Sequence, residues 1–368
     1  MPQQIPDEIL PVTKELVDHL KEQGFTGFSE NTHLMAMPHI LPDVVDLMRG
    51  LIELGMKPEN IHLLGKQYSY VPKVAEELKS MGIDVMPYTP APVGEYYETL
   101  LETDLPNFWK ANTEKLKKAA SEKGAPQELI VFDDGGRLLK STPDELVTDP
   151  NLSVIGVEQT TNGLDVLRET GHEIDVVVPA ASALKLEFEP PFVAEASMRK
   201  LRDKLGIFRN RDVAVIGAGK IGSSVARNLA STDNRVYIYD KAIKVEDGIL
   251  HDPKGLLPED ATICVPVAPE KAHEKKHLIR EGKFGGSKYY VCNSMEEAIQ
   301  RSNYVFGSTG RDIFKDVDLD NFKFSGPHKE RFETRFISVS SGDKEFKSLL
   351  KWMTTKEHNH HGEKHSNG

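Results

Sequence analysis

Three glycines give the strongest chemical signal in the sequence. They form the pattern Gly217-x-Gly219-x-x-Gly222, which follows an apolar run at residues 212–216 and opens a helical stretch. In such a strand–loop–helix unit the first glycine allows a tight turn, the second lets the backbone approach a pyrophosphate, and the third lets helix pack on strand. The phosphates then meet the helix N-terminus. The pattern predicts a dinucleotide-binding loop made of Gly217, Gly219, Lys220, Ile221 and Gly222.

A carboxylate follows at the end of the next predicted strand. Asp240 comes eighteen residues after Gly222, directly after residues 235–239. A carboxylate at this point accepts hydrogen bonds from a ribose 2′-hydroxyl and repels a 2′-phosphate, which favours NAD over NADP. The adjoining Lys241 weakens that preference, because a cation tolerates a phosphate. The alternative is that the glycines serve only a tight strand–helix turn.

A second set of motifs contains side chains that can move protons. In chain order they are Phe132-Asp-Asp134-Gly-Gly, Gly156-Val-Glu158-Gln-Thr160-Thr-Asn-Gly163, Val178-Pro-Ala and Phe306-Gly-Ser308-Thr-Gly310. In this order around a dinucleotide motif they resemble the S-adenosylhomocysteine hydrolase family, from about residue 30 to about residue 345. Members of that family hold NAD tightly, oxidise the 3′-hydroxyl of the substrate ribose, eliminate a thiol, add water and reduce the sugar again.

The resemblance implies a role for each matching residue. Lys185 stands where the family has the lysine implicated in 3′-oxidation, and a lysine beside NAD⁺ could take the hydroxyl proton as hydride leaves. Asp134 and His39 match family residues near the active site. Implied at the cofactor are Thr160, Thr161 and Asn162 from the first domain and Ser308, Thr309 and Gly310 from the second. The predicted catalytic residues are Asp134, Lys185, His39, Gln159 and Glu189.

The chain departs from the family pattern at several of these positions. Gln159 replaces a carboxylate and Glu189 replaces an aspartate, and the further departures are Leu41, Asp43, Pro190 and Asp343. The chain also has extra sequence between Ala242 and Lys288 and no counterpart of the family's C-terminal segment after Trp352. Because each lost acid or base partner is worth ~10²–10⁴ in rate, we expect a substrate other than adenosylhomocysteine.

Structural roles compete with functional ones at each candidate. Asp134 could cap the glycine turn that follows it, Lys185 could be a surface lysine, and His39 could be a satisfied histidine before a helix. Lys66 follows a predicted strand end, where ligands bind in open α/β sheets, so anion binding is possible there, with Ser69 in the same loop. Glu158 precedes Gln159 at another predicted strand end.

The elements that must position these residues alternate between strand and helix. Strands are predicted at 61–65, 84–87, 129–133, 153–157 and 175–179, with an amphipathic helix at 44–54. A long helix at 193–205 links this part to the strand at 212–216. We therefore expect an α/β protein with two doubly wound Rossmann-like domains and the active site in the interdomain cleft. The predicted boundaries are 1–192 for the substrate domain, 193–345 for the NAD domain and 346–368 for a C-terminal helix and disordered tail.

Composition narrows the possible partners. The 368 residues include 46 Lys+Arg and 57 Asp+Glu, a net charge of −11, which disfavours binding to nucleic acid or anionic lipid. Two cysteines, no apolar run of membrane-spanning length and a start without a leader pattern lead us to expect a cytoplasmic protein. The run 271–280, with His273 and His277 four apart, is interpreted as a solvated helix face, so no metal site is predicted.

Three functions are compatible with these observations. The preferred one is an NAD-dependent enzyme related to adenosylhomocysteinase that transfers a hydride from a hydroxyl-bearing carbon of a small-molecule substrate. The second keeps the family's hydrolysis on an altered nucleoside thioether. The third is a catalytically degenerate NAD-binding protein that regulates a partner. A homodimer is expected by analogy.

Overall fold

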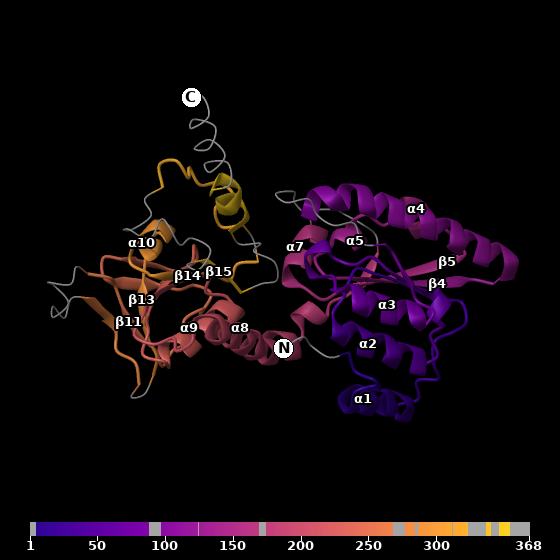
Figure 1. The fold of residues 1–368 in the computed structure, drawn as a ribbon, viewed down its shortest axis with the longest axis horizontal. Helices are drawn as coiled ribbons and strands as arrows, with labels where there is room; N and C mark the ends of the chain where they lie inside the picture. Colours follow the sequence, from indigo (N-terminus) through magenta and orange to yellow (C-terminus); the bar gives the residue numbers. More distant parts are fainter. Residues whose placement is uncertain are drawn as a thin grey trace, which may run out of the picture. The chain divides into compact units, whose positions relative to one another are not determined.

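Two β-sheets, one in each of two compact units, organise the chain. The computed structural model describes residues 5–87, 97–123, 125–168, 174–267, 277–283, 286–310, 312–322, 336–339 and 346–353. The units are Met1–Ser182 and Ala183–Gly368, and each is described by itself below (Figure 1). The assignment of residues 1–192, 193–345 and 346–368 to separate functional domains remains a prediction.

The first unit contains a six-stranded, fully parallel sheet. Its order is β3-β2-β1-β4-β5-β6. The strands are β1 (Thr32–Ala36), β2 (Ile61–Leu63), β3 (Asp84–Val85), β4 (Gln127–Asp133), β5 (Leu152–Glu158) and β6 (Asp175–Val177). The order reverses between β1 and β4, and in open α/β sheets the crevice beside such a point receives the ligand.

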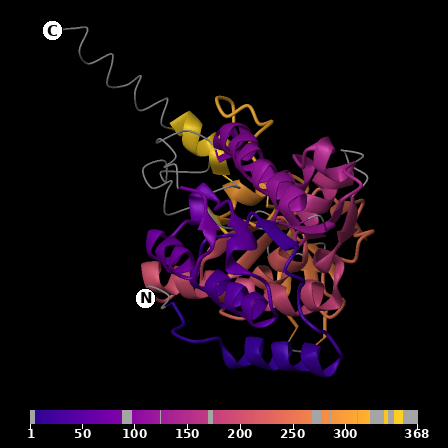
Figure 2. The ribbon, with the colours of Figure 1, turned by 90° about the vertical axis from the view of Figure 1, so that its right-hand side faces the viewer.

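Helices cover both faces of this sheet. They are α1 (Pro11–Glu22), α2 (Pro42–Glu53), α3 (Pro72–Ser80), α4 (Tyr97–Lys123), α5 (Arg137–Lys140), α6 (Asp144–Val147) and α7 (Thr161–Arg168), with 3₁₀ turns η1 (Pro58–Asn60), η2 (Gln67–Ser69) and η3 (Pro179–Ala181). Alternate residues of β1 face opposite layers: Leu34 packs with the α2 and α3 side chains, and Met35 packs with those of α4 and α5. Helix α1 lies on the outer side of α2 (Figures 1 and 2), where Thr13 donates to the buried Asp46.

The second unit contains a seven-stranded sheet of order β12-β11-β13-β8-β7-β14-β15. Its strands are β7 (Asp212–Ile216), β8 (Arg235–Tyr239), β11 (Thr262–Cys264), β12 (Leu278–Arg280), β13 (Lys288–Val291), β14 (Tyr304–Gly307) and β15 (Phe336–Ser338). All neighbours run parallel except β12, which is antiparallel to β11. The order reverses between β7 and β14. Together the two sheets confirm the predicted α/β class with two doubly wound, Rossmann-like halves.

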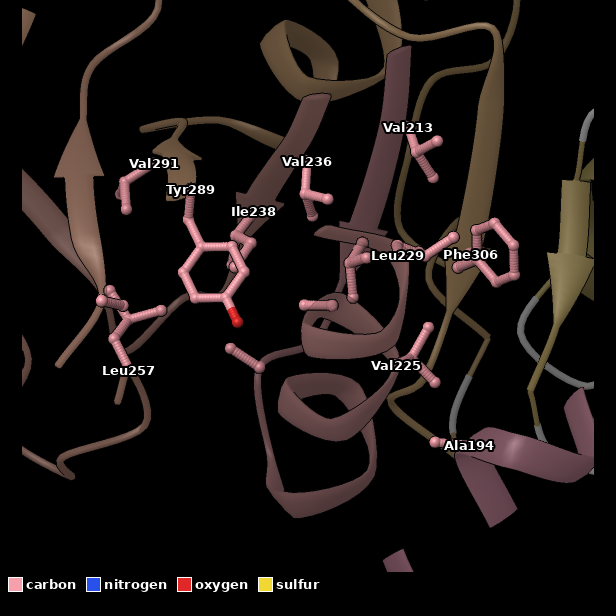
Figure 3. Packing of buried hydrophobic residues seen from close by; sticks show 14 of the residues in the cluster. Ala194, Val213, Val225, Leu229, Val236, Ile238, Leu257, Tyr289, Val291 and Phe306 are labelled. Carbon is pink, nitrogen blue, oxygen red and sulfur yellow. The ribbon is translucent and has the colours of Figure 1, made fainter. Parts of the chain in front are cut away.

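Helices and a hairpin complete the second unit. They are the π-helical turn η4 (Leu184–Phe188), α8 (Glu189–Leu205), α9 (Lys220–Ala230), α10 (Met295–Gln300) and the antiparallel pair β9 (Lys244–Glu246) and β10 (Ile249–His251); residues 347–353 are also helical. Figure 3 shows one face of the core, where Val225 and Leu229 of α9 lie against Val213 and Val236 of the sheet.

Three expectations about the elements need correction. The central strand β1 was not predicted. Helix α8 begins at Glu189 rather than 193, because Pro190 and Pro191 occupy its first turn, where proline has no N–H to lose. Residues 278–280, predicted as part of a solvated helix, form β12, and His273, Asp343 and the tail after residue 353 lie outside the described residues.

Candidate functional site

Five polar side chains meet at the carboxyl edge of the first sheet. His39 follows β1, Lys66 and Ser69 follow β2, Asp134 follows β4, and Gln159 follows β5. We call these five residues the polar cluster. The parallel strands end at one edge of the sheet, so the four loops that carry the cluster converge beside the β1–β4 reversal.

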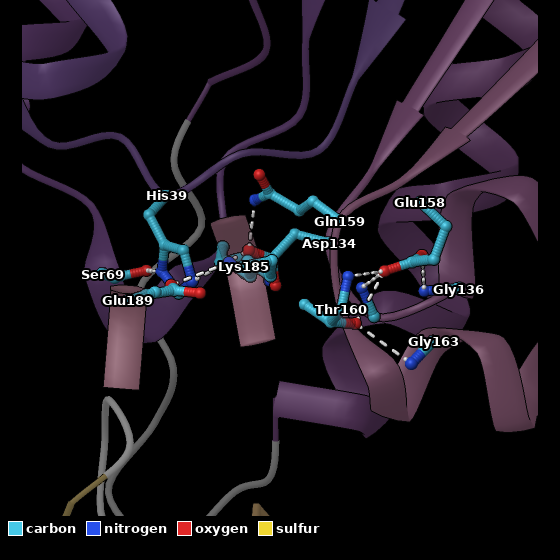
Figure 4. A network of polar contacts seen from close by, with 12 residues as sticks. His39, Ser69, Asp134, Gly136, Glu158, Gln159, Thr160, Gly163, Lys185 and Glu189 are labelled. Atoms are coloured by element: carbon cyan, nitrogen blue, oxygen red, sulfur yellow. Dashed lines mark hydrogen bonds and ion pairs between the residues drawn. The ribbon is translucent and has the colours of Figure 1, made fainter. Parts of the chain in front are cut away.

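Asp134 is the centre of the polar cluster. Its Oδ1 accepts a hydrogen bond and ion pair from the Lys66 ammonium, and its Oδ2 accepts from Gln159 Nε2 at 2.5 Å. His39 Nε2 lies 3.6 Å from the same Oδ2 (Figure 4). Burial by itself would raise the pKa of the Asp134 carboxyl, but Lys66, His39 and Gln159 together hold that pKa below its usual range. Asp134 is therefore ionised at neutral pH and is a weak proton acceptor.

His39 joins the carboxylate to a hydroxyl. Its Nδ1 lies 2.5 Å from Ser69 Oγ, on the side of the ring opposite Asp134. With Nε2 protonated toward Asp134, Nδ1 is free to accept a proton through Ser69, and the carboxylate stabilises the imidazolium that results. The cluster thus contains a better-placed proton acceptor than Asp134 itself.

Lys66 is the cluster member that the predicted catalytic set lacks. Its side chain is 2% exposed, although lysine is almost never fully buried unless it is paired. The signal available in the sequence was its place directly after a strand, which predicted anion binding. The structure shows instead that the anion is Asp134, 68 positions along the chain.

The other two predicted catalytic residues pair with each other. Lys185 lies in η4, and its Nζ donates to Oε1 of Glu189, at the start of α8, at 2.7 Å. The two side chains are 32% and 41% exposed. Both belong to the second unit, so their predicted place beside Asp134 remains a prediction.

Thr160 has a structural role in the loop after β5. Its hydroxyl donates to Glu158 at 2.6 Å and accepts the N–H of Gly163 at 3.0 Å, which caps the start of α7. Thr161 is exposed and Asn162 is partly exposed. The contact of these three residues with a cofactor remains a prediction.

The second unit presents a backbone loop rather than a charged cluster. Gly217 has φ +94°, a left-handed conformation that favours glycine, and a Cβ on Gly222 would lie 1.9 Å from the Gly217 carbonyl oxygen. Nothing lies within 4 Å of the Cβ position of Gly219. The first and third glycines are thus required by the fold, whereas the second faces open space at the N-terminus of α9.

Side chains from β8 and β14 hold this loop. Asp240 Oδ2 accepts the N–H of Ala218 at 2.8 Å, and Ser308 Oγ donates to the Gly217 carbonyl at 2.7 Å. The Thr309 methyl would lie 2.8 Å from a Cβ on Gly217. Gly310, with φ +64°, follows. The structure therefore brings together the predicted residues of the β7 and β14 loops.

Two predicted cofactor residues differ in orientation. Lys220 is exposed at the first turn of α9, whereas Ile221 packs against the hydrophobic core. Ile221 contributes to the site through its backbone N–H alone. The loop as a whole fits a dinucleotide, because an open second glycine, a helix N-terminus and a carboxylate at the end of β8 are the three features that pyrophosphate and ribose require.

Sequence comparisons find relatives without a described function. No known family profile matches the chain. Over 209 residues, 56% of the chain, it is 29% identical to uncharacterized proteins of Mycobacterium tuberculosis strains CDC 1551 / Oshkosh and ATCC 25618 / H37Rv. The match spans 40% of the length of these relatives.

Solved structures resemble the chain only distantly. The dipicolinate synthase of Bacillus halodurans matches with TM-score 0.34 and 10% identity over 90% of this chain and 98% of that one. The Bacillus subtilis dipicolinate synthase gives 0.35 and 9% over 91% and 98%. NAD-dependent formate dehydrogenase from Staphylococcus aureus, in complex with NAD, gives 0.28 and 12% over 77% and 67%. Such scores carry no argument about function, and membership of the adenosylhomocysteinase family is not confirmed.

Two further searches concern the described residues alone. None of their helices has the length and apolar character needed to cross a membrane. Nor do they contain a group of three or more His, Cys, Asp or Glu side chains arranged around a metal position.

Proposed function

We propose that the protein is an NAD-dependent enzyme that removes hydride from a hydroxyl-bearing carbon of a small-molecule substrate. The observation that carries this proposal is the β7 loop, where Gly219 faces open space between Gly217, Gly222 and Asp240. NAD, when bound, would supply the hydride acceptor. Asp240 would receive the ribose 2′-hydroxyl and select against a 2′-phosphate.

The polar cluster of the first unit would bind the substrate. Loss of hydride from a carbinol carbon leaves a carbonyl, so the hydroxyl proton needs an acceptor. His39, with Ser69 on one ring nitrogen and ionised Asp134 facing the other, is suited to accept it. Lys185, which the family resemblance implies for this step, is the competing acceptor.

Cofactor binding and reduction test this proposal. Purified protein should bind NAD more tightly than NADP in calorimetry, and a hydroxylated substrate should produce absorbance near ~340 nm. Gly219→Val should abolish binding and leave the fold intact, since Gly219 has φ −59° and no atom near its Cβ position. If Gly219→Val binds NAD like the parent, the loop is not the cofactor site. If NAD binds and no metabolite in a broad panel is oxidised, the regulatory alternative gains.

Hydrolysis of a nucleoside thioether is the second candidate. It is favoured because His39 and Asp134, which match the family's motifs, lie 3.6 Å apart. Release of free thiol from adenosylhomocysteine or a related thioether, detected with a chromogenic disulfide, would establish it. A cytoplasmic location and a homodimer remain predictions; light scattering of the purified protein tests the latter.

A further inference from the structure

Glu158 connects two loops of the polar cluster from below. It ends β5 and is fully buried. Its Oε1 accepts the N–H of Gly135 at 3.1 Å, and its Oε2 accepts the N–H of Gly136 at 2.7 Å, both in the loop after β4. From its own loop, Thr160 donates its N–H and its hydroxyl to Oε1, each at 2.6 Å (Figure 4). One carboxylate therefore receives four donors from two site loops.

These contacts require an ionised carboxylate. A protonated Glu158 would need an acceptor for its O–H, and every contact found for it among the described residues is a donor. Burial raises the pKa of this carboxyl, and the donors from Thr160, Gly135 and Gly136 oppose that rise. Helices α5 and α7 both begin beside it, and their positive N-termini also favour the negative charge.

The packing around Glu158 leaves it little freedom. A Cβ on Gly163 would lie 2.2 Å from the Glu158 carboxyl carbon. A Cβ on Gly136, which has φ +73°, would lie 2.7 Å from the Gly163 carbonyl oxygen. Both glycines are thus needed for the first turn of α7 to approach the carboxylate, which fixes the spacing between the two loops.

We propose that Glu158 is the positioning residue of the polar cluster. Asp134 directly precedes Gly135, and Gln159 lies between Glu158 and Thr160. By bonding both loops, Glu158 holds Asp134 and Gln159 at the 2.5 Å separation that their side chains show. The role concerns the geometry of the cluster and does not depend on hydride transfer, so failure of the oxidoreductase proposal would leave it standing.

The Glu158→Gln variant tests this role. Its amide group would place N–H against the N–H of Gly136 or Gly135, so one loop must shift. The loss of a hydrogen bond to a charged group should speed hydrogen exchange at Gly135, Gly136 and Thr160 about ten- to a hundredfold. In carbon NMR titrations the midpoint of the Asp134 carboxyl should move up toward that of a free carboxyl, a change that a purely structural loss elsewhere would not cause.

Three variants control the experiment. Thr160→Ser keeps both donors to Glu158 and should behave as the parent, whereas Thr160→Val removes the hydroxyl and should reproduce part of the effect. Asp133→Asn changes a neighbouring buried carboxyl that accepts only from Leu139 N–H, so exchange at Gly135 and Gly136 should not change. If Glu158→Gln folds with parental exchange and an unmoved Asp134 midpoint, the proposal is wrong. If it does not fold, an unaffected Thr160→Val overturns the proposal instead.

Discussion

Both units place a loop at the carboxyl end of a central parallel strand, β4 in the first and β7 in the second, and equip it in opposite ways. After β4 the site consists of charged side chains, with Asp134 paired to Lys66 in a largely buried setting. After β7 it consists of backbone around Gly219, with open space in front. The first site is therefore sensitive to changes in charge, and the second to added atoms. The same fold supports both because strand order fixes only where a site lies, not its chemistry.

Removing the buried cation should have the largest effect on stability. Lys66→Met leaves the Asp134 carboxylate, whose side chain is 15% exposed, without its ion-pair partner. We expect a loss of about 3–5 kcal/mol in the free energy of unfolding, measured in urea. The double variant Lys66→Met/Asp134→Asn should recover most of this loss. A double variant as unstable as the single one would show that the ion pair is not the cause.

The pH dependence of stability should separate the units next. Burial, assisted by the nearby Glu158 charge, raises the pKa of the Asp133 carboxyl to about 7, although the Leu139 N–H opposes the rise. The folded state then holds a proton that the unfolded chain releases near pH ~4. Stability should fall as pH rises from about 4 to about 7, by about 4 kcal/mol.

The Asp133→Asn variant isolates this contribution. It removes the titrating group, so its urea midpoint should exceed that of the parent at pH 8 and the two should converge at pH 4. The comparison between variants cancels the other titrating groups, including Glu158. Parallel pH curves for the two proteins would contradict the assignment.

Added carbon should have a smaller effect, confined to the second unit. Gly222→Ala places a Cβ 1.9 Å from the Gly217 carbonyl oxygen, and overpacking of this kind costs about 1–3 kcal/mol. Gly219→Ala should stay within about 0.5 kcal/mol of the parent. Trp109 lies in the first unit and Trp352 in the second, so single-tryptophan variants would report each transition by fluorescence. An unfolding shift seen by Trp109 alone would contradict the assignment of the effect.

The sequence predicted the backbone site better than the charged one. Gly217, Gly219 and Gly222 carry their meaning in local spacing, so the loop could be identified without its partners. The ion pair of Lys66 with Asp134 depends on strand order, which places residues 68 positions apart at one sheet edge. Strand β1 was missed for a related reason. Thr32-His-Leu-Met-Ala36 is poor in β-branched residues, and its central place comes from pairing with β2 and β4.

Asp240 has a consequence for redesign of cofactor preference. Its two oxygens accept the N–H groups of Ala218, inside the glycine loop, and of Ala242. The residue expected to discriminate between dinucleotides is thus also a support of the phosphate loop. An engineer who replaces it to admit a 2′-phosphate would loosen the loop at the same time. Conversion to NADP use should therefore require a second substitution that supplies a new acceptor for the Ala218 N–H.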